Sequence, residues 1–345
     1  MAIINVPADQ ATIQNGINAA ANGDTVLVAP GTYIETITID KSITLVSSGG
    51  PLVTIIDPPA VEYYLVSIEA SNVVLNGFTI TNPDYVGTAD ASGILTQLAG
   101  RQSNIRILNC IIHDVGSMTR PSASFGTYGI NSGPVDGLEV SNCTIYNIGN
   151  ADATDSEAVG IFIWGNDNVD SAVNINIHDN TVYNVVNPTN DNSGIRLGGA
   201  TSDVTISNNT VHSPVKQGIV TSAGMIGPVS ITHNTVDGAT LYGLLLRSPF
   251  PQTVEYNTIT NNGTGIYISP TSSAPTINYN NIYGNTVGLN NQSAFSVNAL
   301  NNWWGSAAGP NTPGADSIIG VSPVAFFPWL LQPFAPTFRG IRFWQ

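Results

Sequence analysis

The residues best suited to do chemistry gather in one segment near the middle of the chain. Asp152, Asp155 and Glu157 place three carboxylates within six residues. Such a group supplies the oxygen ligands that Ca²⁺ prefers, or an acid and a base for cleaving a glycosidic bond. An ordinary solvated loop has the same composition. If the site is catalytic, we expect these carboxylates to act with Arg120 or Arg196 in a lyase or hydrolase reaction.

Aromatic side chains follow the same segment. Phe162 and Trp164 alternate along a predicted strand, so both point to one face. On the equivalent strands of neighbouring repeats, the same outward position holds Leu95, Asn131, Phe162, Arg196 and Val220, and we expect all five to be exposed. Aromatic surface beside hydrogen-bonding groups suits a sugar ring, and we expect Asn131, Phe162, Trp164, Arg120 and Arg196 to bind carbohydrate. The alternative is ordinary packing of these rings under nearby loops.

Two smaller constellations also fall at equivalent repeat positions. His212 and Asp237 lie one repeat apart, where an aspartate could orient an imidazole as a general base. A column of exposed His and Tyr side chains on a β surface can equally have no function. Cys110 and Cys143 are also one repeat apart, which predicts α-carbons about 4.8 Å apart. That separation permits a disulfide or two buried thiols.

Composition and charge narrow the range of partners. The 345 residues carry a formal charge of −14, which disfavours nucleic acid and anionic membrane surfaces. Neutral sugars, cations and metal-bridged polyanions stay compatible. No apolar run approaches the roughly 20 residues that a membrane span needs. Hydrophobic residues make up 42% and charged residues 9%, so a large core is available.

Internal repeats organise the chain. One signature reads NNTVHSP at 208–214, HNTVDGA at 233–239 and YNTITNN at 256–262, and a second reads SGIRLG at 193–198 and QGIVTS at 217–222. Each repeat has three short strands with period-two alternation, so it cannot bury its apolar face without stacked neighbours. The sequence therefore predicts an all-β fold, a single right-handed parallel β-helix with three-strand coils.

Stacking turns equivalent positions into columns along the axis. We expect an apolar inner ladder and a turn ladder of asparagines. The inner ladder consists of Ile94, Ile130, Ile161, Ile195, Ile219, Leu244, Ile266 and Leu289. The turn ladder consists of Asn180, Asn209, Asn234, Asn257, Asn280 and Asn302, preceded by Phe78, Cys110 and Cys143.

Coil length points to the location of a site. The spacing between turn positions runs 32, 33, 37 and 29 residues, then 25, 23, 23 and 22. The extra residues fall at one corner, roughly at 83–91, 116–127, 149–158 and 187–192. Stacking would make these inserts a wall beside the strands with the GI signature. Long loops on a rigid scaffold are common places for function.

Both ends of the predicted solenoid need covering. We expect an N-terminal cap over residues 1–24, a β-helix over 25–302 with lengthened coils in 76–192, and a C-terminal cap over 303–345. An amphipathic helix over 9–21, with Asp9 as N-cap, fits the first end. The aromatic and proline-rich stretch 303–345 folds back over the other end, or else offers a contact surface for self-association or assembly.

These patterns resemble the pectate-lyase-like parallel β-helix repeat proteins of bacteria and their viruses. The resemblance rests on the opening ADQATIQNGINAAANGDTVLVAPGTYIETITID, the NNTV and GI coils, and the ending NNWWGSAAGPNTPG. It covers the full chain and implies a polysaccharide groove beside the GI strands. The family includes lyases, hydrolases, esterases, epimerases, adhesins and viral spikes. The paired-aspartate and arginine signatures of its enzyme subfamilies are not evident, and fold alone does not fix function.

The resemblance therefore implies a carbohydrate-engaging protein at the cell exterior or on a virion. A non-catalytic structural or adhesive protein is the rival interpretation. The N-terminal sequence MAIINVPADQ lacks the basic start and apolar stretch of a signal peptide. We expect either a signal that has been removed or another exit route, such as lysis of a virus-infected host.

Overall fold

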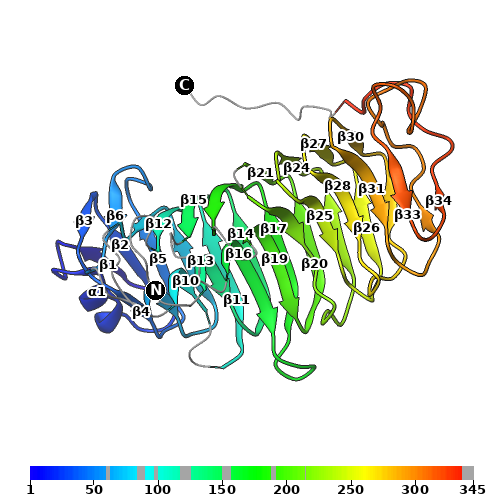
Figure 1. The fold of residues 1–345 in the computed structure, drawn as a ribbon. Helices are drawn as coiled ribbons and strands as arrows, with labels where there is room; N and C mark the ends of the chain where they lie inside the picture. The colour runs from blue at the N-terminus through cyan, green and yellow to red at the C-terminus, as the bar shows by residue number, and fades with distance from the viewer. Residues whose placement is uncertain are drawn as a thin grey trace.

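The chain folds into stacked coils, each made of three short strands. The computed structural model describes residues 1–59, 63–83, 90–96, 100–116, 126–149, 157–187, 192–213 and 215–335. Figure 1 shows the coils arranged along one axis, from blue at the N-terminal end to red at the C-terminal end. Successive strands enter three parallel sheets in turn, which we call sheets A, B and C. The predicted parallel β-helix is confirmed.

Within the described ranges, sheet A has 13 strands, sheet B has 10 and sheet C has 11. Sheet A contains β1 (Ile3–Val6), β2 (Thr25–Val28), β5 (Thr44–Ser47), β8 (Val73–Asn76), β11 (Gln102–Leu108), β14 (Val135–Ser141), β17 (Ala172–His178), β20 (Thr201–Ser207), β23 (Val229–Thr232), β26 (Gln252–Glu255), β29 (Thr276–Asn278), β32 (Val297–Asn298) and β34 (Val324–Ala325). Sheet B contains β3 (Gly31–Tyr33), β6 (Thr54–Ile56), β9 (Thr79–Thr81), β12 (Ile111–Val115), β15 (Thr144–Gly149), β18 (Thr181–Val186), β21 (Thr210–His212), β24 (Thr235–Asp237), β27 (Thr258–Thr260) and β30 (Asn281–Tyr283). Sheet C contains β4 (Ile37–Ile39), β7 (Tyr64–Ile68), β10 (Ala91–Leu95), β13 (Thr127–Ser132), β16 (Ala158–Gly165), β19 (Asn192–Gly199), β22 (Gln217–Val220), β25 (Tyr242–Leu246), β28 (Thr264–Ile268), β31 (Val287–Asn291) and β33 (Ile318–Gly320).

The predicted inner apolar ladder runs through sheet C in register. Ile94 pairs with Ile130, and the pairing continues coil by coil to Leu289. All eight side chains are fully buried. Because burial of one such side chain contributes about 1.5–3 kcal/mol, the ladder is a major part of the core.

The predicted asparagine ladder is also confirmed, and its amides bond in both directions along the axis. Asn209 Oδ1 accepts from the backbone N of Asn180 at 3.0 Å and from its Nδ2 at 2.9 Å. Asn209 Nδ2 donates to Asn234 Oδ1 at 3.0 Å and to the carbonyl of Ile177 at 2.9 Å. The same pattern recurs as far as Asn302. Each buried amide is satisfied only when the next coil is present.

In the earlier coils, Phe78, Cys110 and Cys143 occupy this column in place of asparagine, as expected. The register Ile111 with Thr144 places Cys110 beside Cys143. Both thiols are buried and free. The structure thus has the two buried thiols rather than the disulfide.

A short helix, α1 (Ile13–Ala19), lies at the N-terminal end, and its Ile13 and Ile17 are buried. The predicted start and cap are wrong: the N-cap is Thr12, whose side chain accepts from the backbone N of Asn15 at 3.1 Å. Asp9 Oδ2 instead accepts from the backbone N and Nδ2 of Asn5, both at 2.8 Å. That carboxylate is therefore committed to the turn after β1.

The second coil holds α1 at both ends. Glu35 accepts from the backbone N of Ile13 at 2.8 Å and of Gln14 at 3.0 Å. Lys41 Nζ donates to three carbonyls at the other end, including that of Asn18 at 2.7 Å. These charges match the helix dipole and satisfy its free backbone groups. Glu35 thus has a structural role.

The C-terminal stretch adds strands and a returning segment. Strand β33 pairs with β31, and β34 pairs with β32, so sheets C and A extend beyond residue 303. Asn281 Oδ1 accepts from the backbone N of Phe334 at 2.7 Å, and its Nδ2 donates to the Phe334 carbonyl at 2.8 Å. The Phe334 ring also lies 5.1 Å from that of Tyr256. The exact cap boundaries at 24 and 303 stay predictions.

Removing one amide of the turn ladder tests its energetic weight. In Asn209→Ala, the backbone N–H of Asn180 and the carbonyl of Ile177 lose buried partners. We expect a loss of about 2–4 kcal/mol in the free energy of unfolding, measured by urea titration, because each orphaned buried group costs about 1–3 kcal/mol. Thr205→Ala, at an exposed position of the same coil, is the control and should cost less than about 0.5 kcal/mol. Equal losses in the two variants would contradict the account.

Candidate functional site on sheet C

The predicted columns on the outer face of sheet C are in register. Leu95, Asn131, Phe162, Arg196 and Val220 pair in succession. The prediction that all five are exposed is wrong, because Leu95, Asn131 and Val220 are only 1%, 5% and 2% exposed. Phe162 and Arg196 are half-buried. Among these five residues, the accessible side chains are therefore those of Phe162 on β16 and Arg196 on β19.

The predicted inserts all join sheet B to sheet C at the same corner. Strands β9, β12, β15 and β18 end before them, and β10, β13, β16 and β19 begin after them. Most insert residues lie outside the described residues, including Asp152, Asp155 and Arg120. Their predicted catalytic, Ca²⁺ and carbohydrate roles stay predictions. Glu157, the last residue before β16, is described.

Glu157 connects two neighbouring coils. Its Oε1 accepts from the Tyr128 hydroxyl of β13 at 2.9 Å, and its Oε2 accepts from Nη1 of Arg196 on β19. The side chains of Glu157 and Arg196 are 20% and 14% exposed. This ion pair is thus far less screened than an open surface pair. The carboxylate at the centre is held from both sides.

Gly126 makes room for the Tyr128 hydroxyl. A Cβ at Gly126 would lie 2.0 Å from that hydroxyl oxygen, so no other residue fits without displacing the ring. The backbone N of Gly126 donates to Asp90 Oδ1 at 2.9 Å. Asp90, Gly126 and Glu157 directly precede the paired strand residues 91, 127 and 158. The hydroxyl therefore lies over the coil between the two carboxylates.

The surroundings of Asp90 and Tyr128 raise the pKa of both side chains. Burial raises the pKa of Asp90, and the nearby Glu157 charge raises it further. Burial also raises the pKa of Tyr128, with added repulsion of its phenolate by Glu157. Tyr128 thus stays a neutral hydrogen-bond donor. The Asp90 carboxyl retains its proton at higher pH than an ordinary aspartate does.

Aromatic side chains surround this cluster. The Phe162 ring stacks on Tyr128 with centroids 5.5 Å apart and planes 13° apart. Trp164 Nε1 donates to Asn131 Oδ1 at 3.1 Å, which fixes the indole. Tyr63 lies near Asp90, is 36% exposed, and has a pKa raised by burial and by the Asp90 charge. We call Asp90, Tyr128, Glu157, Phe162, Trp164 and Arg196 the sheet C cluster.

Sequence reasoning found four of these six residues and missed Asp90 and Tyr128. A signal was present, because aligning the residues at this corner gives DASGI (90–94), GTYGI (126–130) and EAVGI (157–161). Asp90 and Glu157 share one column, and the glycine between them is the informative feature. Only the side-chain direction of Tyr128, which folds back over Gly126, required the structure.

His212 and Asp237 do not form the predicted general-base pair. The two residues pair in register, but Asp237 Oδ1 accepts from Asn261 Nδ2 at 2.8 Å. His212 instead ends an aromatic stack on sheet B, 4.8 Å from the Tyr183 ring. The stack continues through Tyr146 to His113. This column packs rings against each other.

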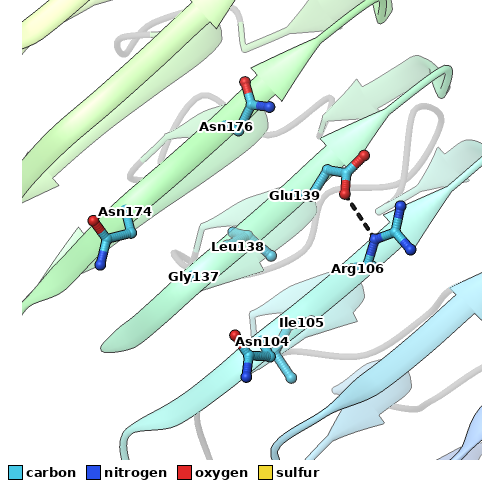
Figure 2. A pocket seen from close by; sticks show the side chains of 8 residues that line it. All are labelled: Asn104, Ile105, Arg106, Gly137, Leu138, Glu139, Asn174 and Asn176. Carbon is cyan, nitrogen blue, oxygen red and sulfur yellow. Dashed lines mark hydrogen bonds and ion pairs between the residues drawn. The ribbon is translucent and has the colours of Figure 1, made fainter.

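A separate shallow hollow of about 260 Å³ lies on sheet A. Figure 2 shows its lining from β11, β14 and β17, with Arg106 Nε donating to Glu139 Oε2 at 2.7 Å. The remaining lining residues are Asn104, Ile105, Gly137, Leu138, Asn174 and Asn176. Arg106 is about half-exposed, so its ion pair contributes little to stability.

Over the described ranges, no three His, Cys, Asp or Glu side chains come together as metal ligands would. The Ca²⁺ prediction rests on Asp152 and Asp155 and so is not tested. The part of the chain that the structure describes also contains no helix of sufficient length and apolarity to span a bilayer.

Comparison with known proteins agrees with the architecture. A family model for the right handed beta helix region matches residues 159–307. The A-module of the mannuronan C-5 epimerase AlgE4 from Azotobacter vinelandii is 16% identical, with a TM-score of 0.56 over 95% of this chain and 94% of that chain. No curated protein sequence matches the chain significantly.

Two lyases have similar structures. Pectate lyase Pel9A is 13% identical, with a TM-score of 0.53 over 95% of this chain and 78% of that chain. An alginate lyase from Paenibacillus sp. strain FPU-7 is 15% identical, with a TM-score of 0.51 over 94% of this chain and 99% of that chain. The protein is a right-handed parallel β-helix. It shares this fold with the three solved structures named above.

Replacing Asp90 tests the electrostatics of the cluster. Because its pKa is raised in the folded state above 3.8, the ionised carboxylate destabilises the fold at neutral pH. Asp90→Asn should therefore raise the melting temperature at pH 7, and the gain should vanish as pH falls below that value. Asp167, whose pKa is lowered by backbone N–H groups of Asp170 and Val169, is the control. Asp167→Asn should have the opposite sign at pH 7, and a shared sign would refute the assignment.

Proposed function

We propose that this protein engages a polysaccharide through the outer face of sheet C. The observation that carries the proposal is the Glu157 carboxylate, held between the Tyr128 hydroxyl and Arg196 and flanked by half-buried aromatic rings. Aromatic faces cover the apolar faces of sugar rings, while charged and hydroxyl groups bond sugar hydroxyls. Cluster residues come from successive coils, so a chain-like ligand following the axis would meet each in turn.

The similar structures support this class of ligand. By their names, they act on mannuronan, alginate and pectate, which are polysaccharides. The negative charge of the chain favours such a ligand over nucleic acid. Polysaccharides of this kind occur outside cells, and we place the protein at a cell exterior or on a virion.

Glycan binding is tested by affinity electrophoresis in gels that contain a polysaccharide. Trp164→Ala and Arg196→Gln should each weaken retardation by about tenfold, equal to about 1.4 kcal/mol. The matched controls are Phe295→Ala, an exposed ring at the C-terminal end, and Arg106→Ala in the sheet A hollow. Both controls should bind like the unmodified protein. Loss of binding in Arg106→Ala alone would move the site to sheet A.

The second candidate is a structural or adhesive protein that self-associates through its C-terminal end. Exposed apolar side chains gather near the last strands, namely Phe295, Ile319, Val321, Phe327 and Leu331. Strands β33 and β34 are also the last strands of sheets C and A, which leaves pairing groups for a second copy. Sedimentation velocity tests this: concentration-dependent dimers that Val321→Ser with Phe327→Ser abolishes would support it, and a monomer at all concentrations would refute it.

A further inference from the structure

We propose that the sheet C site has a second sugar-binding subsite, formed by Tyr242, Tyr267 and Arg247, and that its ligand is a linear glycan lying along the axis of the β-helix. This inference rests on the proposed function, because it extends the same face to a second place and sets a minimum length for the ligand. It starts from an aromatic pair that occurs twice on this face.

The two ring pairs have the same position relative to their strands. Tyr128 lies three residues before the register partner of Phe162, and the two rings stack with centroids 5.5 Å apart. Tyr242 lies three residues before the register partner of Tyr267, and these rings have centroids 4.7 Å apart and planes at 36°. In each pair, a ring of the later coil is therefore held against a ring of the earlier coil.

The sequence repeats in the same way. The segment YGI at 128–130 is followed in the next coil by GIFI at 160–163. The segment YGL at 242–244 is followed in the next coil by GIYI at 265–268. The glycine and the inner apolar residue belong to the general repeat, so the added aromatic residues distinguish these two places from the other GI strands.

A translation along the axis relates the two pairs. Strand pairing leads from Phe162 on β16 through β19, β22 and β25 to Tyr267 on β28, always at the same outward position. Four rungs of about 4.8 Å place the two rings roughly 19 Å apart along the sheet. Because one sugar ring of an extended glycan advances about as far as one rung, the two pairs suit a chain of roughly four rings or more.

Apolar and small residues occupy the rungs between the pairs. Val220 and Leu245 continue the column and are 2% and 1% exposed. Two residues further along the strands, Gly198 and Ser222 follow Trp164 in register. These positions offer few polar groups to a sugar, so binding should come mainly from the two ends of this stretch.

Arg247 and two phenol hydroxyls supply polar contacts at the second pair. Leu246 is buried, so alternation turns Arg247 to the outer face, diagonally from Tyr267. The backbone N of Arg247 donates to Thr221 Oγ1 at 2.9 Å, which fixes the end of the strand. The side chains of Tyr242, Tyr267 and Arg247 are half-buried, and in the part of the chain that the structure describes no protein group bonds their polar ends. These polar ends can therefore bond sugar hydroxyls.

Two subsites on one rigid face make affinity depend on ligand length. A glycan that spans both pairs binds the second pair as an intramolecular step, whereas a short glycan contacts one pair at a time. A single site on β16 and β19 would gain nothing from rings that extend beyond it.

The experiment measures affinity against ligand length. Xylan, galactomannan, laminarin, alginate and polygalacturonate are screened by affinity electrophoresis, and oligosaccharides of about two to eight rings from each retained polymer are titrated by calorimetry. Affinity should rise at least about tenfold between about three and about six rings. Tyr267→Ala and Trp164→Ala should each remove that rise, because each variant leaves one subsite.

Two further variants serve as controls. Tyr267→Phe keeps the ring and should keep most of the rise. Tyr283→Ala removes a tyrosine that is 38% exposed on sheet B and should keep the whole rise. Melting temperatures near that of the unmodified protein verify that the variants are folded.

The contrary results separate this inference from the proposed function. Constant affinity from about three to about six rings, with binding still lost in Trp164→Ala, overturns the second subsite and leaves the proposed function standing. A full rise in Tyr267→Ala, or an equal loss in Tyr283→Ala, also overturns the assignment to Tyr267. Full affinity of Trp164→Ala at every length, or no retained polymer, overturns the proposed function itself.

Discussion

In-register stacking of parallel coils is the constraint on which the rest of this structure depends. Each coil is too thin to bury its own apolar side chains, and each buried asparagine needs the next coil for its hydrogen bonds. A shift of one residue in any strand would turn its inner ladder residue outward. The repeat sequence therefore fixes register, and register fixes which distant residues become neighbours.

The sheet C cluster is a direct consequence of that register. Asp90 and Glu157 are 67 positions apart in the sequence, yet they occupy the same column with Gly126 between them. The glycine leaves space that the Tyr128 hydroxyl fills. Burial of Asp90 opposes its ionisation, so the site is kept at a cost in stability that the long ladders offset. The coils tolerate this unfavourable burial of Asp90 because the paired strands on either side hold the backbone in place.

Much of this could be predicted from sequence, and the failures have physical reasons. The ladders, the coil corners and the column of Phe162 and Arg196 follow from period-two alternation and repeat alignment. The helix cap was misplaced because Asp9 and Thr12 are both good caps, and Glu35 favours the later start through contacts from another coil. Exposure of Asn131 was misjudged because alternation gives the direction of a side chain and not what covers it. Tyr128 was missed because its side chain folds back over Gly126, where the lack of a side chain leaves room for the hydroxyl.

The central claim is that a glycan contacts the outer face of sheet C beside Phe162, Trp164 and Arg196. A crystal structure of the protein with a bound oligosaccharide tests it most directly. The account predicts a sugar ring against Phe162 and Trp164, with its hydroxyl groups near Arg196. An oligosaccharide seated in the hollow beside Arg106 and Glu139, with the sheet C cluster unoccupied, would contradict it.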